Sequence, residues 1–283
     1  MGIGHCSPLS NAKRKLPPGS PQRPSAKRTK HRLGISSLPN DILSSITSKL
    51  SLKEAARTSI LSSQWRRLWL CRAYIDLSHH TVLSESDKER SWTGPRGFIF
   101  NELPATLPRL EMLSLSCTQL EKVDSVSRLS KFRSLHHLIL NWTISDSARG
   151  TTDILDLGCL LEAAPFMEKL ELHMVTDHFL HKRYRQEDGE LRSLPSCPHS
   201  HLSLVHISGF IGEKDQLELA LHIIHNATVL EALKIDPWPR TANPVRARVK
   251  SENRLANGRS VALEFLCKDD HRSVVSVLED VGE

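Results

Sequence analysis

The segment Cys197-Pro198-His199-Ser200-His201 comes closest, by residue type and spacing, to a set that could do metal chemistry. A thiolate and imidazoles are preferred ligands of Zn²⁺, and residues two apart in a strand share one side. Pro198 disfavours a regular strand, however, and the sequence offers no fourth ligand at a suitable spacing. The alternative, that these side chains only pack or face solvent, is favoured, so we expect no metal site.

Other titratable residues form no catalytic set in the sequence. Two histidine pairs, His178 with His181 and His222 with His225, stand without carboxylates at ligand spacing. Acidic residues open a predicted helix over residues 215–224, where the helix dipole favours anions, and these indicate capping: Glu213, Asp215 and Glu218. The sequence has no glycine-rich phosphate loop, nucleophile elbow, Cys-x-x-Cys pair or EF-hand loop. We therefore predict a protein that is not an enzyme and needs no cofactor.

Residues 38–69 carry the signals of three short helices. Pro39 fits the first turn of a helix capped by Ser37 or Asn40, and four apolar residues share one face of it: Ile42, Leu43, Ile46 and Leu50. A capping box, Ser51 with Glu54, opens the second helix, whose predicted stripe is Leu52, Ala55, Ala56, Ser59 and Ile60. Ser62 or Ser63 caps the third. Helices this short are marginal alone, so they either cap the following domain or are completed by another protein.

This segment resembles an F-box, especially the plant version. The resemblance rests on the Leu38-Pro39 opening, the apolar spacing through Leu52 and the closing Trp65-Arg-x-Leu-Trp69, with Thr47-Ser48 as a departure where a bulkier apolar residue is common. It implies docking on a Skp-type adaptor, which joins the chain to the cullin and RING subunits of a ubiquitin ligase. The resemblance assigns adaptor binding to Leu38, Pro39, Ile42, Leu43, Ile46, Leu50, Leu52, Ala55, Leu61 and Trp65.

Further along the chain, a Leu-x-x-Leu-x-Leu pattern recurs five times at irregular intervals. The alternating pair places two apolar side chains on one face of a short strand, and stacked units bury a core that no single unit could. The triplets are Leu110-Leu113-Leu115, Leu135-Leu138-Leu140, Met167-Leu170-Leu172, Leu202-Val205-Ile207 and Leu230-Leu233-Ile235. The alternative is an ordinary α/β domain. In a repeat array, we expect the intervening positions to bind a target: Glu111, His136, Glu168 and Ser203.

Residues 201–237 resemble the FBD region that follows the F-box and leucine-rich segments of plant proteins. The whole resembles an F-box/FBD/leucine-rich-repeat protein with a shortened repeat region, because residues 79–104 stand where further repeats are usual, and this would leave the first repeat with an exposed edge. The expected fold class is α+β, a small three-helix F-box followed by an irregular α/β leucine-rich-repeat solenoid. The expected domains are a disordered basic tail (1–34), F-box (35–77), linker (78–103), leucine-rich repeats (104–200), FBD-like segment (201–238) and C-terminal segment (239–283).

The basic charge of the chain belongs to residues 1–34, which hold eight Lys or Arg and no acidic residue. Removing these eight from 38 basic residues leaves 30 against 32 acidic ones, so a nucleic-acid-binding fold is not implied. Two basic clusters match a bipartite nuclear import signal: Lys13, Arg14 and Lys15, then Lys27, Arg28 and Lys30. The alternative is that this segment is only a solvated tail. No apolar run is long enough to span a bilayer, and no secretion signal opens the chain. The six cysteines are dispersed, and without a secretion signal we expect them to be reduced. The expected location is the nucleus or the cytoplasm.

The resemblance to this family implies the substrate-recruiting subunit of a ubiquitin ligase of the Skp–cullin–F-box (SCF) type. Its partners would be the adaptor, the cullin and RING subunits through it, and an unknown target protein, with no membrane and no nucleic acid. A first alternative is a nuclear leucine-rich-repeat scaffold that is not coupled to ubiquitination. A second is a truncated family member that recruits no target.

Overall fold

The computed structural model describes residues 38–50, 52–58, 60–70, 73–77, 103–117, 131–144, 153–176, 182–239 and 252–279. The basic clusters, almost all of the expected linker, and the histidines His178 and His181 lie outside these residues. None of the helices in the described ranges is long and apolar enough to cross a membrane.

The F-box-like segment forms helices α1 (Asn40–Ser48), α2 (Leu52–Thr58) and α3 (Ser63–Leu70). Neither expected residue is seen capping α1: Pro39 occupies the N-cap position, Asn40 is the first helical residue, and Ser37 lies outside the described ranges. The hydroxyl of Ser62 accepts a hydrogen bond from the N–H of Trp65 (3.4 Å), so Ser62 caps α3. Ser51 of the expected capping box also lies outside the described residues.

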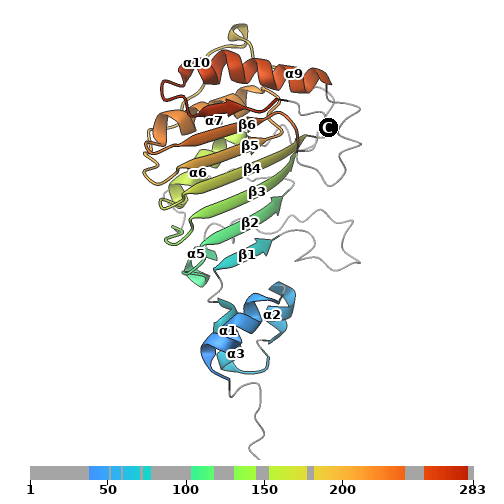
Figure 1. Ribbon diagram of the computed structural model, residues 1–283, viewed down its shortest axis with the longest axis vertical. Coiled ribbons are helices and arrows are strands. Elements are labelled where there is room, and N and C mark those ends of the chain that lie inside the picture. Colours follow the sequence, from blue (N-terminus) through green and yellow to red (C-terminus); the bar gives the residue numbers. More distant parts are fainter. Residues whose placement is uncertain are drawn as a thin grey trace, which may run out of the picture. The chain divides into compact units, whose positions relative to one another are not determined.

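The rest of the described chain is built on one parallel sheet of seven strands, which neighbour one another in chain order (Figure 1). The strands are β1 (Tyr74–Leu77), β2 (Met112–Cys117), β3 (His137–Ile144), β4 (Lys169–Thr176), β5 (Leu204–Ser208), β6 (Ala232–Asp236) and β7 (Val275–Val277). A parallel neighbour requires a crossover, and each crossover returns the chain to the same end of the sheet.

The five predicted triplets are confirmed as the core of this sheet. All fifteen side chains are buried, and the register aligns Leu113 with Leu138, Leu170, Val205 and Leu233 across five strands. Because side chains alternate along a strand, this alignment makes one continuous apolar layer facing the helices.

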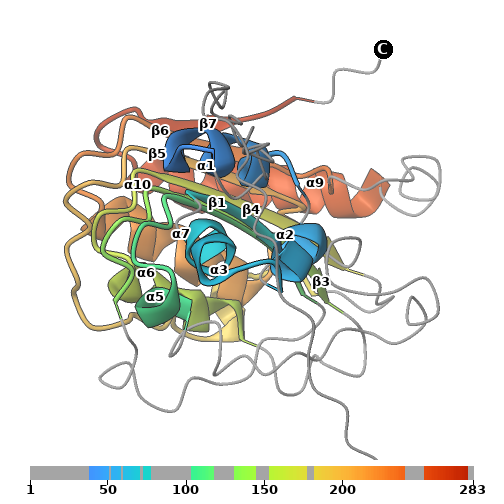
Figure 2. The same ribbon diagram turned by 90° about the horizontal axis from the view of Figure 1, so that it is seen from below.

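Helices cover that apolar layer. They include α5 (Leu103–Thr106), η6 (Ile154–Asp156), α6 (Leu157–Ala163) and α7 (Lys214–Asn226), and Figure 2 shows α5, α6 and α7 gathered on the same side of the strands. Leu217, Ala220 and Ile223 of α7 belong to the same buried cluster as the strand residues. The helix expected over residues 215–224 is therefore present, and its apolar face packs on the sheet.

Two strands were not expected from the sequence. Tyr74–Leu77, which the prediction assigned to the end of the F-box, pairs with β2 as strand β1, so the first predicted repeat has a neighbour and is not the sheet's edge. Val275–Val277, in the expected C-terminal segment, pairs with β6 as β7. The same segment supplies α9 (Glu252–Val261), the π-helix η8 (Ala262–Leu266) and α10 (Cys267–Asp269), with Val261, Ala262 and Leu266 buried in the core.

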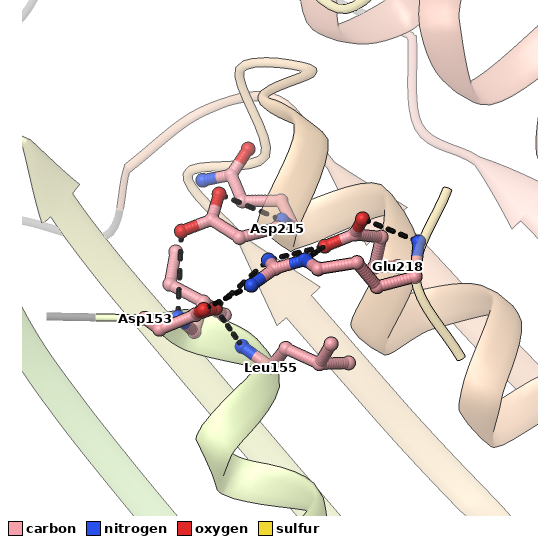
Figure 3. A network of polar contacts seen from close by, with 7 residues as sticks. Asp153, Leu155, Asp215 and Glu218 are labelled. Atoms are coloured by element: carbon pink, nitrogen blue, oxygen red, sulfur yellow. Dashed lines mark hydrogen bonds and ion pairs between the residues drawn. The ribbon is translucent and has the colours of Figure 1, made fainter. Parts of the chain in front are cut away.

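The connection before β5 is held by a polar anchor. In residues 182–203 the only regular element is the short helix η7 (Gln186–Asp188). Arg192 donates from its backbone N–H (2.7 Å) and its Nε (2.9 Å) to the carboxylate of Glu218 on α7, and its guanidinium also binds Asp153. Figure 3 shows this network, in which Asp153 also accepts the N–H of Leu155 (3.1 Å).

The role expected for Glu218 is therefore corrected. Its side chain is fully buried and pairs with the Arg192 guanidinium, so it does not cap the start of α7. Asp215 accepts the N–H of Ile154 (3.3 Å), which ties the start of α7 to η6 (Figure 3). Glu213 and Gln216 form the capping box of α7, as expected of residues at this helix start.

Candidate functional site

Helix α1 exposes a stripe of large apolar side chains. Leu38, Ile42 and Ile46 stand four residues apart and are 37%, 46% and 38% exposed. Ile42 and Ile46, four residues apart within α1, share one face of the helix, and Leu38 lies two residues before its start. Leu43, the next residue after Ile42, is fully buried.

The turn between α2 and α3 also exposes large apolar side chains. Helix α2 ends at Thr58, and the turn is closed by hydrogen bonds from Ile60 N–H to Arg57 C=O and from Leu61 N–H to Thr58 C=O. Ile60 is 87% exposed and Leu61 59%, so the expectation that Ile60 belongs to the stripe of α2 is wrong. We call Leu38, Ile42, Ile46, Ile60 and Leu61 the exposed apolar set.

Some residues assigned to adaptor binding are interior instead. Leu43, Ala55 and Trp65 are buried, and Leu43 and Trp65 pack with Leu68 in a small cluster of their own. They hold the helices together because the helices bury these side chains against one another, so they offer no surface to a partner in this structure. Pro39 is exposed and Leu50 is half-buried, whereas the side chain of Leu52 lies outside the described residues.

Thr47, the departure from the F-box pattern, is also interior. Its side chain is 1% exposed, and its hydroxyl donates to the carbonyl of Ser44 (2.9 Å). A hydroxyl satisfied within its own helix can be buried at small cost.

The second candidate surface is the outward face of the sheet, formed by the strand side chains that point away from the core. The residues that we expected on this face do not lie on the strands. Each is the residue directly before a strand begins: Glu111, His136, Glu168 and Ser203. Their backbone N–H groups donate to the equivalent carbonyls of the preceding unit, at 2.8 to 2.9 Å. The alternation of the strand therefore assigns the outward face to the next residue and every second one after it.

A network of histidines and a carboxylate occupies the outward face at β3 and β4. The Oε1 atom of Glu171 lies 2.9 Å from His137 Nε2 and 2.8 Å from Lys169 Nζ, while its Oε2 lies 3.4 Å from His173 Nε2. Burial acts to raise the pKa of Glu171, but the hydrogen bonds from Lys169 and His137 outweigh it and lower that pKa to about 2. Glu171 is therefore a carboxylate at any physiological pH.

The network continues onto β5 and β6. His173 Nδ1 lies 2.9 Å from the hydroxyl of Ser208, and His206 packs edge-on against the ring of His173 and 4.0 Å from Asp236. Ser208, His173 and Glu171 follow the order of a hydrolytic triad. Ser208 is fully buried, however, so its hydroxyl cannot meet a substrate, and the arrangement is a structural hydrogen-bond network.

The structure separates the residues considered for metal binding. His199 lies against His222, with 3.4 Å between their Nε2 atoms, whereas His201 packs on the ring of Phe166. Among the described residues, no three side chains of the metal-binding types converge. His225, whose side chain is exposed, pairs with Asp269 of α10.

Comparisons with known proteins show that the segments carrying the two candidate surfaces each match a known domain family. The sequence profile of the At1g61320/AtMIF1 leucine-rich-repeat domain matches residues 75–273, and that of the F-box domain matches residues 35–72. The first match covers well over half of the chain and overlaps nearly all of the sheet. It therefore includes most of β1, which the repeat pattern did not reveal.

Individual proteins of Arabidopsis thaliana that are similar to this chain are named as F-box proteins. The putative FBD-associated F-box protein At5g56690 is 30% identical over 189 residues, covering 58% of this chain and 44% of that protein. The F-box/LRR-repeat protein At3g58900 is 33% identical over 120 residues, covering 42% and 34%. The F-box protein At3g59150 is 36% identical over 88 residues, covering 30% and 18%. The chain thus spans less than half the length of these relatives.

Proposed function

Because the chain belongs to the plant F-box/FBD/leucine-rich-repeat family, we propose that it recruits substrates to an SCF-type ubiquitin ligase. The F-box would bind a Skp-type adaptor and the repeat sheet would bind a target protein. The mechanism is proximity, since holding a target near the conjugating enzyme raises the effective concentration of its lysines. No nucleophile is required of this subunit.

The observation that carries the proposal is the exposed apolar set. Between Leu38 and Leu61, five large apolar side chains of a small helical segment face solvent in the free chain. Exposed apolar patches of this kind mark protein interfaces, and a few such residues dominate the binding energy. A docked adaptor would also stabilise a segment whose own core is the small cluster of Leu43, Trp65 and Leu68.

Adaptor capture by the purified full chain tests the assignment. Replacing Ile42 and Ile46 by Asp places charges in the interface, and since both side chains are exposed the fold should be retained. We expect at least a hundredfold loss of affinity, about 3 kcal/mol. The matched control is Leu263→Asp, an equally exposed apolar residue of η8, which should bind like the parent chain.

Titration calorimetry with a plant Skp adaptor measures both variants. Undiminished binding by the Ile42→Asp/Ile46→Asp chain would remove the F-box surface from the proposal. Absence of binding by the parent chain would favour the alternative of a nuclear scaffold that never meets a cullin.

A further inference from the structure

The outward face of the sheet is the second exposed surface. On it, the carboxylates are less exposed to solvent than the lysine side chains. Around β4 the carboxylate of Glu171 is 14% exposed, while the Lys169 side chain that binds it is 43% exposed. On β6, Asp236 lies beside His206 and is 17% exposed, whereas Lys234 is exposed. The carboxylates are thus recessed and satisfied, and the cations protrude.

Strand register fixes the geometry of these cations. Lys169 on β4 stands level with Leu204 on β5, and Lys234 on β6 stands level with His206, two residues further along β5. Strand spacing and rise put the two lysine positions about 12 Å apart. Leu204, which is 41% exposed, lies on the strand between them.

A ligand that fits this pattern is an extended peptide segment with two carboxylates flanking an apolar side chain. In an extended chain, alternate residues share one side, and residues four apart are about 13 Å apart. An acid-x-apolar-x-acid sequence therefore presents two carboxylates and one apolar group at the spacing of Lys169, Leu204 and Lys234. Each lysine has donors to spare, since Lys169 spends one on Glu171.

We infer that the outward face around Lys169, Leu204 and Lys234 recognises an acidic segment of the target protein with an apolar residue at its centre. This inference rests on the proposed function, of which it specifies the target chemistry. His137 and His206 border the site and are partly exposed.

The probe is a fluorescein-labelled peptide, Gly-Glu-Ser-Leu-Ser-Glu-Gly, with Gln and Lys versions in place of Glu. Fluorescence anisotropy with the full chain at low ionic strength should show binding of the Glu peptide, weakening as salt rises. Lys169→Gln with Lys234→Gln should weaken that binding roughly tenfold, and Leu204→Ser should weaken it by roughly half as much on a logarithmic scale. All three residues are partly or fully exposed, so the fold should tolerate the changes.

The matched control is Lys182→Gln with Lys268→Gln, which removes the same charge from exposed lysines outside the outward face. It should bind like the parent chain. Equal losses in both double variants would show attraction by net charge alone, and unchanged binding in both would show binding elsewhere, such as on the basic segment 1–34; either result would overturn the inference. So would equal binding of the Gln or Lys peptide, or no binding at all.

Adaptor capture distinguishes this inference from the proposed function. The Lys169→Gln/Lys234→Gln chain should still bind the Skp adaptor. If it does and the Glu peptide fails to bind the parent chain, the target chemistry is wrong while the ligase assignment stands.

Discussion

At the scale of single residues, the pair His199–His222 shows how hydrogen bonds assign protons. Asn226 accepts the N–H of Cys197 with its Oδ1 (3.2 Å), which turns its Nδ2 donor toward His222 Nδ1 (3.1 Å). His222 must therefore carry its proton on Nε2 and donate to His199 Nε2. Both rings are neutral, and burial, aided by His222, lowers the pKa of His199 to about 4.

This neutral pair predicts an acid-sensitive stability. In the unfolded chain a histidine titrates near pH 6.5, so below that pH the unfolded state takes up a proton that folded His199 refuses until about pH 4. Stability is therefore full above pH 6.5 and falls as pH drops toward 4, by about 3 kcal/mol for a shift of this size. Urea unfolding across this range measures the slope.

The control for that experiment changes an exposed histidine. His199→Gln should flatten the slope between pH 6.5 and 4, while His136→Gln should leave it unchanged, because His136 is exposed. An unaltered slope in the His199 variant would contradict the lowered pKa of His199.

At the scale of elements, the repeat triplets predicted five strands because each has all three apolar positions. The two missed strands lack the first one: the residue three before Ile75 is Arg72, and the residue three before Val275 is Arg272. Arg272 instead donates to the carbonyls of Ile224 (2.7 Å) and Ala227 (2.8 Å) at the end of α7. A charged residue at the first position of the triplet makes the repeat unrecognisable in the sequence. In the fold, the Arg272 side chain donates to the backbone carbonyls at the end of α7 that have no partner within the helix.

The sites were less predictable than the strands for a related reason. Apolar periodicity identifies what is buried, but on a short helix such as α1 it cannot tell Ile42, which is exposed, from Leu43, which is buried. The outward network of Glu171 and its histidines depends on neighbours that are distant in the sequence, on other strands. Only the alternation around Leu170 and Leu172 indicated its position.

The anchor between Arg192 and α7 gives a prediction at this scale. Arg192→Met leaves the fully buried carboxylate of Glu218 without its cation, and should cost about 3 kcal/mol. Adding Glu218→Gln removes the stranded charge, so the double variant should recover part of that loss. A double-mutant cycle by urea unfolding measures it, and simple additivity of the two substitutions would contradict a direct pairing.

At the scale of the whole molecule, the charge is divided between a basic first segment and a nearly neutral remainder. We propose that the basic segment directs nuclear import. Replacing Lys27, Arg28 and Lys30 by Ala in a fluorescent fusion should move the protein from nucleus to cytoplasm, because the receptor groove loses one of two cationic clusters. Replacing Lys214, Lys234 and Lys268 removes as much charge elsewhere and should leave the distribution unchanged. An identical shift in both variants would implicate net charge alone.

The hydrogen bonds that join residues 73, 111, 136, 168, 203 and 231 carry a consequence for how such proteins grow. Each of these bonds joins one unit to the carbonyl of the unit before it. A whole unit can then be gained or lost in evolution, because the units on either side of it can form the same backbone hydrogen bond with each other. Repeat number in this family can thus drift by duplication and deletion without a new fold having to be found each time.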